Sequence, residues 1–536
     1  LPNLNAVHVG LLTNAVVTAV TASILFVWLT DLGFARLSAA LTTLAYGLCT
    51  IAWVYARMFW ESSLLALSFL VAVWAIYRST RLAYARQRLV WIAVSGIAIA
   101  IGLTLRFETA PAIIFIGLFI LWESVGWRFS QLSEVGWSLP EAEQAQVFNL
   151  TPTAKLGAFL GAIPWGRLLI YILPTLLIGL GLLYFNLVRY GSLSETGYSQ
   201  ELLFRAPWVG GYGLLLSPGR GLFLYAPLTI LLFFGIRPAR RRLSFAYFWM
   251  IAALCLFYWL FYGSWFAWGG TWGWGPRFLL PILPLLMLFV AEPIEWLYRQ
   301  TVKQHLAEKP LAILTRLPRA NVQIALAWAG LGVIIGLSLI VNLLGIVVDF
   351  NEHFLRLNRN DNFVFNWATF PPLAHWQIMQ EGRLDLIWLR TTASGPVIEW
   401  SILTPALLLV SLATVGLGLM IRLEVLGLGK VRLPQQEVTH YRQHLLAEAH
   451  TMPRTTLAVL LFVLLPLMLT YQMMTNTALA ALENGQLQAD NPLLTTLARD
   501  SQPGDALLVP SPPYGDVQEI STALMAYFDQ PLPTSI

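Results

Sequence analysis

The chain is dominated by apolar runs, each close to the length that crosses a lipid bilayer. A membrane helix needs about 20 mostly apolar residues, because the hydrocarbon core is about 30 Å thick and each helical residue rises about 1.5 Å. The sequence therefore predicts an all-α polytopic membrane protein with about twelve transmembrane helices. The twelve runs are residues 6–29, 37–55, 59–77, 89–105, 109–125, 167–188, 221–236, 244–262, 278–297, 323–348, 399–420 and 455–474.

The charge content agrees with lipid as the main solvent and partner of the chain. Only 11% of the 536 residues are charged, whereas a soluble domain carries about 25%. The net charge of +5 comes from short basic clusters between the apolar runs, not from one basic stripe, so we expect no nucleic-acid partner. Cys49 and Cys255 both lie inside apolar runs, where they predict neither a disulfide nor a metal site.

The distribution of basic residues predicts the orientation of the chain. Loops that alternate along the sequence, all on one side, hold about two thirds of the Lys and Arg residues, and such loops stay in the cytoplasm. The long loops 189–220, 263–277 and 349–398 then face outward. We expect a multi-pass protein of the cytoplasmic membrane with its active face extracytoplasmic.

The sequence divides into a transmembrane domain, residues 1–474, and an extracytoplasmic C-terminal segment, residues 475–536. Within the latter, Pro503, Gly504 and Asp505 form a turn signal before an apolar run, which is typical of the start of a small α/β domain. The orientation also places the N-terminus outside. We therefore predict one more N-terminal span, which gives thirteen in the full-length protein.

Two candidate sites lie at predicted outer turns. Arg57 and Glu61 are four residues apart and share one face of a helix, with Glu61 near a helix N-terminus. They form either a capping ion pair or a carboxylate that serves as a base or an orienting acceptor. Arg106 and Glu108 lie in the next tight turn. Arg106 either anchors the chain at the interface or binds a phosphate with its planar fork. An Arg on the outer side runs against the bias of basic residues toward the cytoplasm, and this favours phosphate binding.

The third candidate is the loop at residues 265–277, which holds four Trp and four Gly residues in thirteen positions. An interfacial belt explains the Trp residues but not the glycines. Aromatic faces together with bare backbone amides suit the apolar face of a sugar ring or an isoprenoid. No Walker loop, dinucleotide fingerprint or zinc-ligand spacing occurs, and we predict no metal-ligand residues.

Four stretches in residues 1–290 carry a resemblance to a known family. They are the segment from Thr50 to Glu61, the segment from Gly102 to Arg106, the pair Tyr190–Tyr198 and Ser217–Phe223, and the segment from Trp268 to Arg277. In the order of these stretches, and in the side of the membrane on which they are predicted to lie, the chain resembles the phospholipid-carrier-dependent glycosyltransferases of the GT-C superfamily. These are relatives of protein O-mannosyltransferases and aminoarabinose transferases.

The resemblance implies a membrane glycosyltransferase that moves a sugar from a polyprenyl-phosphate donor to an acceptor on the outer face. Glu61 and Glu108 would be catalytic. The substrate-binding residues would be Tyr55, Arg57, Arg106, Tyr198, Arg220, Trp268, Trp274 and Arg277. The family's main catalytic Asp lies in the first outer loop, which we expect to precede residue 1, and the need for a divalent metal stays open.

Two other classes of function stay open. A transporter of a lipid-linked substrate would show broken helices with charged residues near the bilayer midplane, and Pro174, Pro281 and Pro284 are candidate kinks. A non-catalytic scaffold subunit of a larger membrane assembly would keep the fold without the chemistry.

Overall fold

The computed structural model describes residues 6–138, 163–195, 204–307 and 319–415, apart from short gaps such as 271–272 and 358–360. This part of the chain is mostly helical, which confirms the all-α polytopic membrane fold. Most of the run at 399–420, all of the run at 455–474 and the segment 475–536 lie outside the described residues. Eight of the described helices are long and apolar enough to cross a membrane. They are α1 (Ala6–Asp31), α4 (Glu61–Arg81), α5 (Ala85–Leu105), α6 (Ala110–Ser138), α9 (Trp165–Tyr190), α13 (Phe245–Ser264), α14 (Leu283–Ala307) and α15 (Arg319–Val347).

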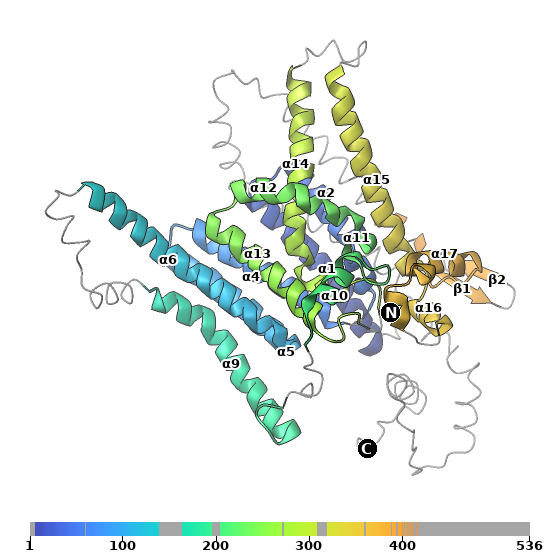
Figure 1. Ribbon diagram of the computed structural model, residues 1–536, viewed down its shortest axis with the longest axis horizontal. Coiled ribbons are helices and arrows are strands. Elements are labelled where there is room, and N and C mark those ends of the chain that lie inside the picture. Colours follow the sequence, from blue (N-terminus) through green and yellow to red (C-terminus); the bar gives the residue numbers. More distant parts are fainter. Residues whose placement is uncertain are drawn as a thin grey trace.

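Helix α14 forms the centre of the bundle, and α9 and α15 lie at its edges (Figure 1). The apolar window of α14 is 89% buried, whereas those of α9 and α15 are only 11% buried. Small residues let helices approach closely in a membrane. A Cβ at Gly96 of α5 would lie 2.2 Å from the carbonyl oxygen of Tyr171, so only glycine lets α9 pack there.

The run at 37–55, predicted as one span, is a broken helix. It forms α2 (Arg36–Leu48) and α3 (Ile51–Ala56), which are separated at Cys49 and Thr50. The Thr50 hydroxyl accepts a hydrogen bond from the backbone N–H of Ala52 at 3.2 Å and so caps α3. A polar cap inside an apolar run is the local signal that the prediction overlooked.

The run at 221–236 is broken as well, because Pro227 cannot donate a backbone hydrogen bond. It forms α11 (Leu222–Tyr225), η3 (Pro227–Leu231) and the first part of α12 (Leu232–Arg242). Two side chains of α15 satisfy the freed backbone groups. The Leu228 N–H donates to Ser338 Oγ at 2.8 Å, and Asn342 Nδ2 donates to the Tyr225 carbonyl at 2.8 Å.

Both broken segments still pass from one end of the bundle to the other. Helix α4 defines these ends, since it begins at Glu61 and ends beside Asp31, to which Arg78 is paired at 2.8 Å. We call them the Glu61 end and the Arg78 end. Arg220 precedes the second broken segment and lies at the Glu61 end, whereas Arg242 closes it and pairs with Glu292 at 2.6 Å at the Arg78 end.

Residues 349–398 form a small cap on the Glu61 end. Gly219 donates its backbone N–H to the Val364 carbonyl of the cap at 3.0 Å. The two cap strands are antiparallel, with Leu389 opposite Ile398. The cap elements are α16 (Phe350–Arg356), η6 (Asp361–Val364), η7 (Trp367–Thr369), α17 (Pro371–Gln380), β1 (Leu389–Thr392) and β2 (Gly395–Ile398).

Candidate functional site

A network of two carboxylates around one guanidinium lies at the Glu61 end. Arg106 follows α5 directly and precedes η1 (Phe107–Thr109). Its Nε donates to Glu61 Oε1 at 2.7 Å, and its Nη1 donates to Glu108 Oε1 at 3.1 Å. The Tyr262 hydroxyl, near the end of α13, accepts from the same Nη1 at 3.1 Å and donates to Glu108 Oε1 at 3.0 Å. The network thus joins α4, η1 and α13 through Arg106.

The two acids differ in their access to solvent. The Glu61 side chain is 28% exposed, and that of Glu108 is 8% exposed. Burial alone would lower the pKa of Arg106, but Tyr262, Glu61 and Glu108 together raise its pKa above the ordinary value. Arg106 therefore remains a permanent cation, and Glu61 is the acid that a ligand can reach. Arg106 is held by two carboxylates, Glu61 and Glu108.

A second guanidinium lies next to this network. Arg277 opens η4 (Arg277–Ile282), and its Cζ lies 4.3 Å from the centroid of the Trp60 ring and 4.8 Å from that of Phe278. The Phe278 ring stacks on Tyr262 with centroids 4.6 Å apart, and the Cζ of Arg106 lies 5.7 Å from the Phe278 centroid. Two cations thus share one aromatic surface, where the rings hold them by cation–π attraction.

Arg220 shapes the glycine-rich loop from inside. Its guanidinium is buried and donates to the Gly269 carbonyl, to the Gly270 carbonyl at 2.6 Å and to the Gly273 carbonyl at 2.5 Å. The backbone of Gly273 has φ +128°, and a Cβ there would lie 2.5 Å from the Tyr55 hydroxyl. That hydroxyl donates to the Trp274 carbonyl at 3.0 Å. Arg220 and Tyr55 therefore hold the loop in shape and leave their polar atoms little freedom for a ligand.

The two described tryptophans of this loop that were predicted to bind substrate are packed into the fold. Trp274 is 0% exposed, with its ring centroid 5.1 Å from that of Tyr225 and 4.6 Å from that of His375. Its ring has no open face for a sugar. Trp268 is partly buried against the glycines of α10 (Pro207–Leu216), where a Cβ at Gly213 would lie 2.1 Å from the ring.

Arg57 does not pair with Glu61. Helix α3 ends at Ala56 and α4 begins at Glu61, so the two residues do not share a helix, and the predicted capping pair is wrong. Arg57 instead forms an ion pair with Asp385 of the cap and donates to the Ile346 carbonyl. Glu61 does open a helix, as the sequence predicts. Arg57 therefore fastens the cap to the bundle.

Two buried histidines lie in the cap, His375 beside Trp274 and His353 beside His375. His375 Nδ1 lies 2.9 Å from the Leu344 carbonyl and must donate to it, since a carbonyl only accepts. Burial lowers the pKa of His353 to about 4 and that of His375 to about 3. Both rings are neutral at pH 7.

The sequence prediction missed several members of the site. Tyr262, Trp60 and Phe278 flank predicted residues along the chain, but a Tyr, Trp or Phe near a membrane interface is too common to single out. Asp385 lies far from Arg57 in sequence, and no pattern links them. Tyr198 lies outside the described residues. Among the residues that the structure describes, no group of three or more His, Cys, Asp or Glu side chains is placed to hold a metal ion.

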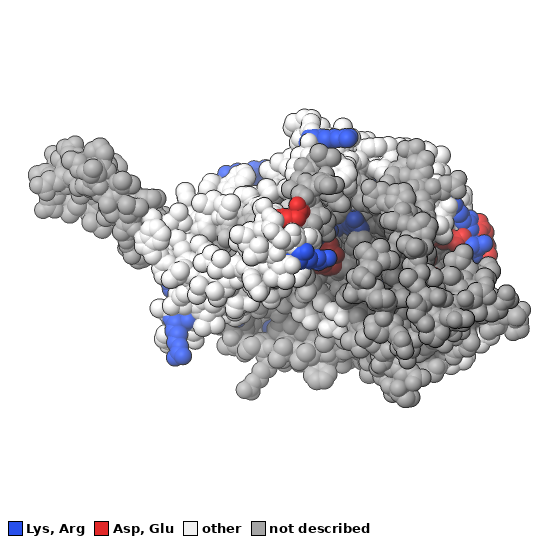
Figure 2. Space-filling view, turned by 90° about the horizontal axis from the view of Figure 1, so that it is seen from below, with Lys and Arg blue, Asp and Glu red and all other residues white. Residues whose placement is uncertain are grey.

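The charged side chains on this surface lie in groups. The Glu61 end points downward in Figure 1, so Figure 2 looks onto it. Acidic and basic side chains lie next to one another near the middle of this face, where most other described residues are uncharged. A second group of opposite charges lies at the right edge of the same view, so the charged side chains of the described residues are grouped on this face.

The chain matches no protein-family model, and no curated protein matches it. Among solved structures it is similar to the crystal structure of ArnT from Cupriavidus metallidurans in the apo state. The alignment has 14% sequence identity and a TM-score of 0.33, and it covers 68% of this chain and 60% of that chain. The chain therefore aligns with less than two thirds of that protein's length.

Proposed function

We propose that the protein is a membrane glycosyltransferase of the GT-C type, which transfers a sugar from a polyprenyl-phosphate donor to an acceptor hydroxyl at the extracytoplasmic face. The observation that carries the proposal is the cluster of Arg106, Arg277, Glu61 and Glu108 at one end of a membrane bundle. It combines cations for a phosphate with carboxylates for a hydroxyl, and the sequence resemblance points to the same chemistry.

The two guanidinium groups suit the leaving group. When the bond between the sugar C1 and the phosphate oxygen breaks, its electron pair goes to that oxygen and negative charge develops there. Cations already held in place stabilise such charge best, because they need no reorganisation. Arg106 and Arg277 share the Phe278 surface and supply two of them. The isoprenoid tail would remain in lipid.

The Glu61 carboxylate is suited to act on the acceptor hydroxyl. In the resting protein its carboxylate is paired with Arg106, and an incoming donor phosphate would compete for the same guanidinium. Binding of the donor would therefore release Glu61 toward the acceptor. The acceptor oxygen then forms its bond to C1 and loses its proton. The Glu61 carboxylate either takes this proton itself or orients the hydroxyl toward another base that takes it.

Glu108 suits a polar part of the sugar. Its Oε1 accepts from Arg106 and Tyr262, but its Oε2 is buried and has no hydrogen-bond partner among the described residues. Buried polar atoms are nearly always satisfied, by protein or by water or ligand. A sugar hydroxyl that donates a hydrogen bond to Oε2 would give both carboxylate oxygens of Glu108 a partner.

A transfer assay tests the proposal. The purified chain in liposomes is given polyprenyl-phosphate sugars and acceptor lipids, and Glu61→Gln and Arg106→Ala are compared with the wild type. We expect each variant to lose at least about a hundredfold in transfer rate, the usual scale for a lost electrostatic or acid–base group. Arg189→Ala is the matched control, since Arg189 lies at the end of α9, exposed and away from the network.

The other classes give different results. Full activity in both variants removes the site assignment. A wild-type protein that moves labelled donor across the bilayer without transfer is a transporter, and one that does neither is a scaffold. The described breaks at Thr50 and Pro227 do not favour transport, because protein groups cap or satisfy the backbone there.

A further inference from the structure

A pocket of about 740 Å³ opens at the Arg78 end, between α4, α5, α6 and α9. The last turn of α4 contributes Ser79 and Thr80, and Pro164 contributes together with residues 165–167 of the first turn of α9. None of the proposed catalytic or substrate-binding residues lines it. Because Ser79 follows Glu61 by about 18 residues on the same helix, at about 1.5 Å each, the pocket lies about 27 Å along α4 from the carboxylate network. It is a separate site, independent of the proposed function.

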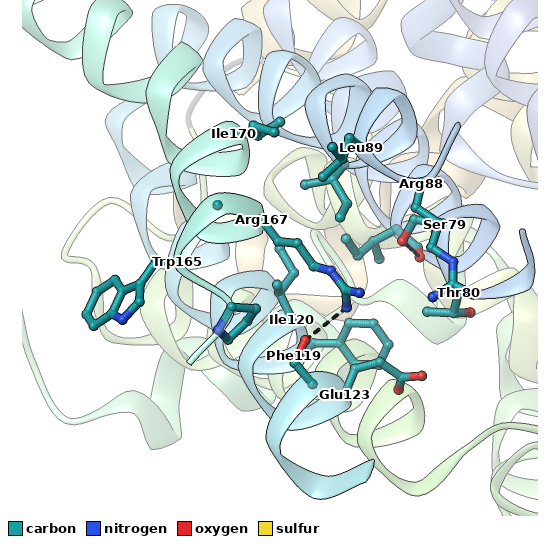
Figure 3. A pocket seen from close by; sticks show the side chains of 15 residues that line it. Ser79, Thr80, Arg88, Leu89, Phe119, Ile120, Glu123, Trp165, Arg167 and Ile170 are labelled. Carbon is teal, nitrogen blue, oxygen red and sulfur yellow. Dashed lines mark hydrogen bonds between the residues drawn. The ribbon is translucent and has the colours of Figure 1, made fainter. Parts of the chain in front are cut away.

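The pocket has an apolar wall and a charged part. The apolar wall comes from Ile76, Leu89, Ile92, Phe119, Ile120 and Ile170. Arg167 reaches across from α9 toward α6, where its Nη1 donates to Ser124 Oγ at 3.1 Å (Figure 3). The carboxyl group of Glu123 lies in the same pocket, and Arg88 lines it from α5. Charged and apolar surfaces meet in one cavity, as the two parts of an amphiphile require.

The signs of the charges select the headgroup. Two arginines suit a phosphate, and the first turn of α9 adds the positive end of a 26-residue helix on the same side. The single carboxylate of Glu123 would repel a purely anionic headgroup but would pair with a cation beside the phosphate. A headgroup that carries both a phosphate and an ammonium group matches both features, since its ammonium can donate three hydrogen bonds.

The walls suit the rest of such a molecule. Helix α9 is mostly exposed beyond Thr175, and Gly96 of α5 lets α9 pack closely at Tyr171, next to Ile170 of the pocket. An amphiphile in the pocket would therefore place its headgroup between Arg88, Arg167 and Glu123 and its chains against the isoleucines and the surrounding bilayer. A soluble phosphate would leave the apolar wall bare.

We propose that this pocket binds a single aminophospholipid, a glycerophospholipid whose headgroup carries a primary ammonium group next to its phosphate. Arg88 and Arg167 bind the phosphate, and Glu123 binds the ammonium. The bound lipid fills the space between α9 and the α4–α5 pair and secures α9 at the edge of the bundle.

Native mass spectrometry of the purified, delipidated full chain tests this proposal. The protein is titrated with phosphatidylethanolamine, phosphatidylglycerol and phosphatidylcholine, and retained lipid is counted. We expect one phosphatidylethanolamine to bind about tenfold more tightly than the other two, because hydrogen bonds to charged groups commonly carry a factor of that size. Glu123→Gln should abolish this preference, whereas Arg167→Gln should weaken the binding of all three lipids.

The matched control is Arg86→Gln, because Arg86 lies on α5 two residues from Arg88 but is exposed and does not line the pocket. Its lipid binding should equal that of the wild type, while Arg88→Gln weakens it. Thermal unfolding of each variant separates lost binding from lost folding. Equal retention of the three lipids by the wild type, an unchanged preference in Glu123→Gln, or competition by soluble glycerophosphoethanolamine at equal concentration would each overturn the proposal.

Discussion

The Nε of Arg106 lies 2.7 Å from Glu61 Oε1, and this contact ties the first turn of α4 to the turn that ends α5. Both partners are part-buried, so salt screens the pair less than a surface ion pair, yet it is still open to a competing anion. The contact that orders the resting site is therefore the one that a donor phosphate would replace.

Arg106→Lys should separate charge from geometry. Lys keeps the positive charge but loses the planar fork that meets two acceptors at once. We expect the KM for a polyprenyl-phosphate donor to rise by about tenfold or more, with a smaller loss in kcat. Steady-state transfer kinetics measure both, and an unchanged KM would show that Arg106 does not contact the donor.

Tyr262→Phe should destabilise the protein. The substitution removes a buried hydroxyl that accepts from Arg106 and donates to Glu108, which leaves a buried carboxylate with one hydrogen bond fewer. We expect a loss of roughly 1–3 kcal/mol in the free energy of unfolding. Thermal unfolding in detergent measures it, and Tyr184→Phe, exposed on α9, should unfold like the wild type.

Gly273→Ala should distort the glycine loop, whereas Gly269→Ala should not. At Gly273 φ is +128° and a new Cβ would meet the Tyr55 hydroxyl, but at Gly269 the nearest atom, Val364 Cγ2, is 3.6 Å away. We expect a cost of about 1–3 kcal/mol at Gly273 alone. Equal unfolding temperatures for the two variants would show that the loop tolerates a side chain there.

Arg57→Ala should loosen the cap. The side chain is 9% exposed and joins Asp385 and the Ile346 carbonyl, so its loss leaves both acceptors without this partner. We expect faster limited proteolysis within residues 349–398, and partial restoration in the exchanged pair Arg57→Asp with Asp385→Arg. Arg356→Ala, in an exposed ion-pair cluster of the cap, serves as the control and should change the cleavage rate little. Identical rates for Arg57→Ala and the wild type would rule out Arg57 as the fastener.

The cap should lose stability in acid. His353 and His375 have folded pKa values of about 4 and 3, below the unfolded value near 6.5, so unfolding takes up protons between these limits. Their contribution is complete above about pH 6.5 and is lost as the pH falls toward 4, by roughly 1 kcal/mol per pH unit for each ring. Unfolding between pH 7.5 and 5 measures this slope, which His375→Gln should reduce. An unchanged slope in that variant would mean that other groups set it.

Much of the membrane fold follows from the sequence, and the exceptions have local causes. Eight apolar runs form helices of spanning length, because a continuous helix satisfies its own backbone hydrogen bonds where lipid offers none. The runs at 37–55 and 221–236 broke because Thr50 and Pro227 interrupt them. Their breaks are tolerated only because neighbouring groups, such as Ser338, complete the hydrogen bonding.

The candidate site also has features that follow from the sequence and features that depend on packing. The sequence by itself determined that Glu61, Arg106 and Arg277 occur at the ends of apolar segments on one predicted side, since charge is excluded from the hydrocarbon core. Only the tertiary structure decided their partners. Arg57 forms an ion pair with Asp385, and Arg220 donates hydrogen bonds to the glycine carbonyls. Arg106 forms ion pairs with Glu61 and Glu108. The physical reason is that hydropathy is additive along a chain, whereas a hydrogen bond between residues far apart in sequence depends on how the helices pack.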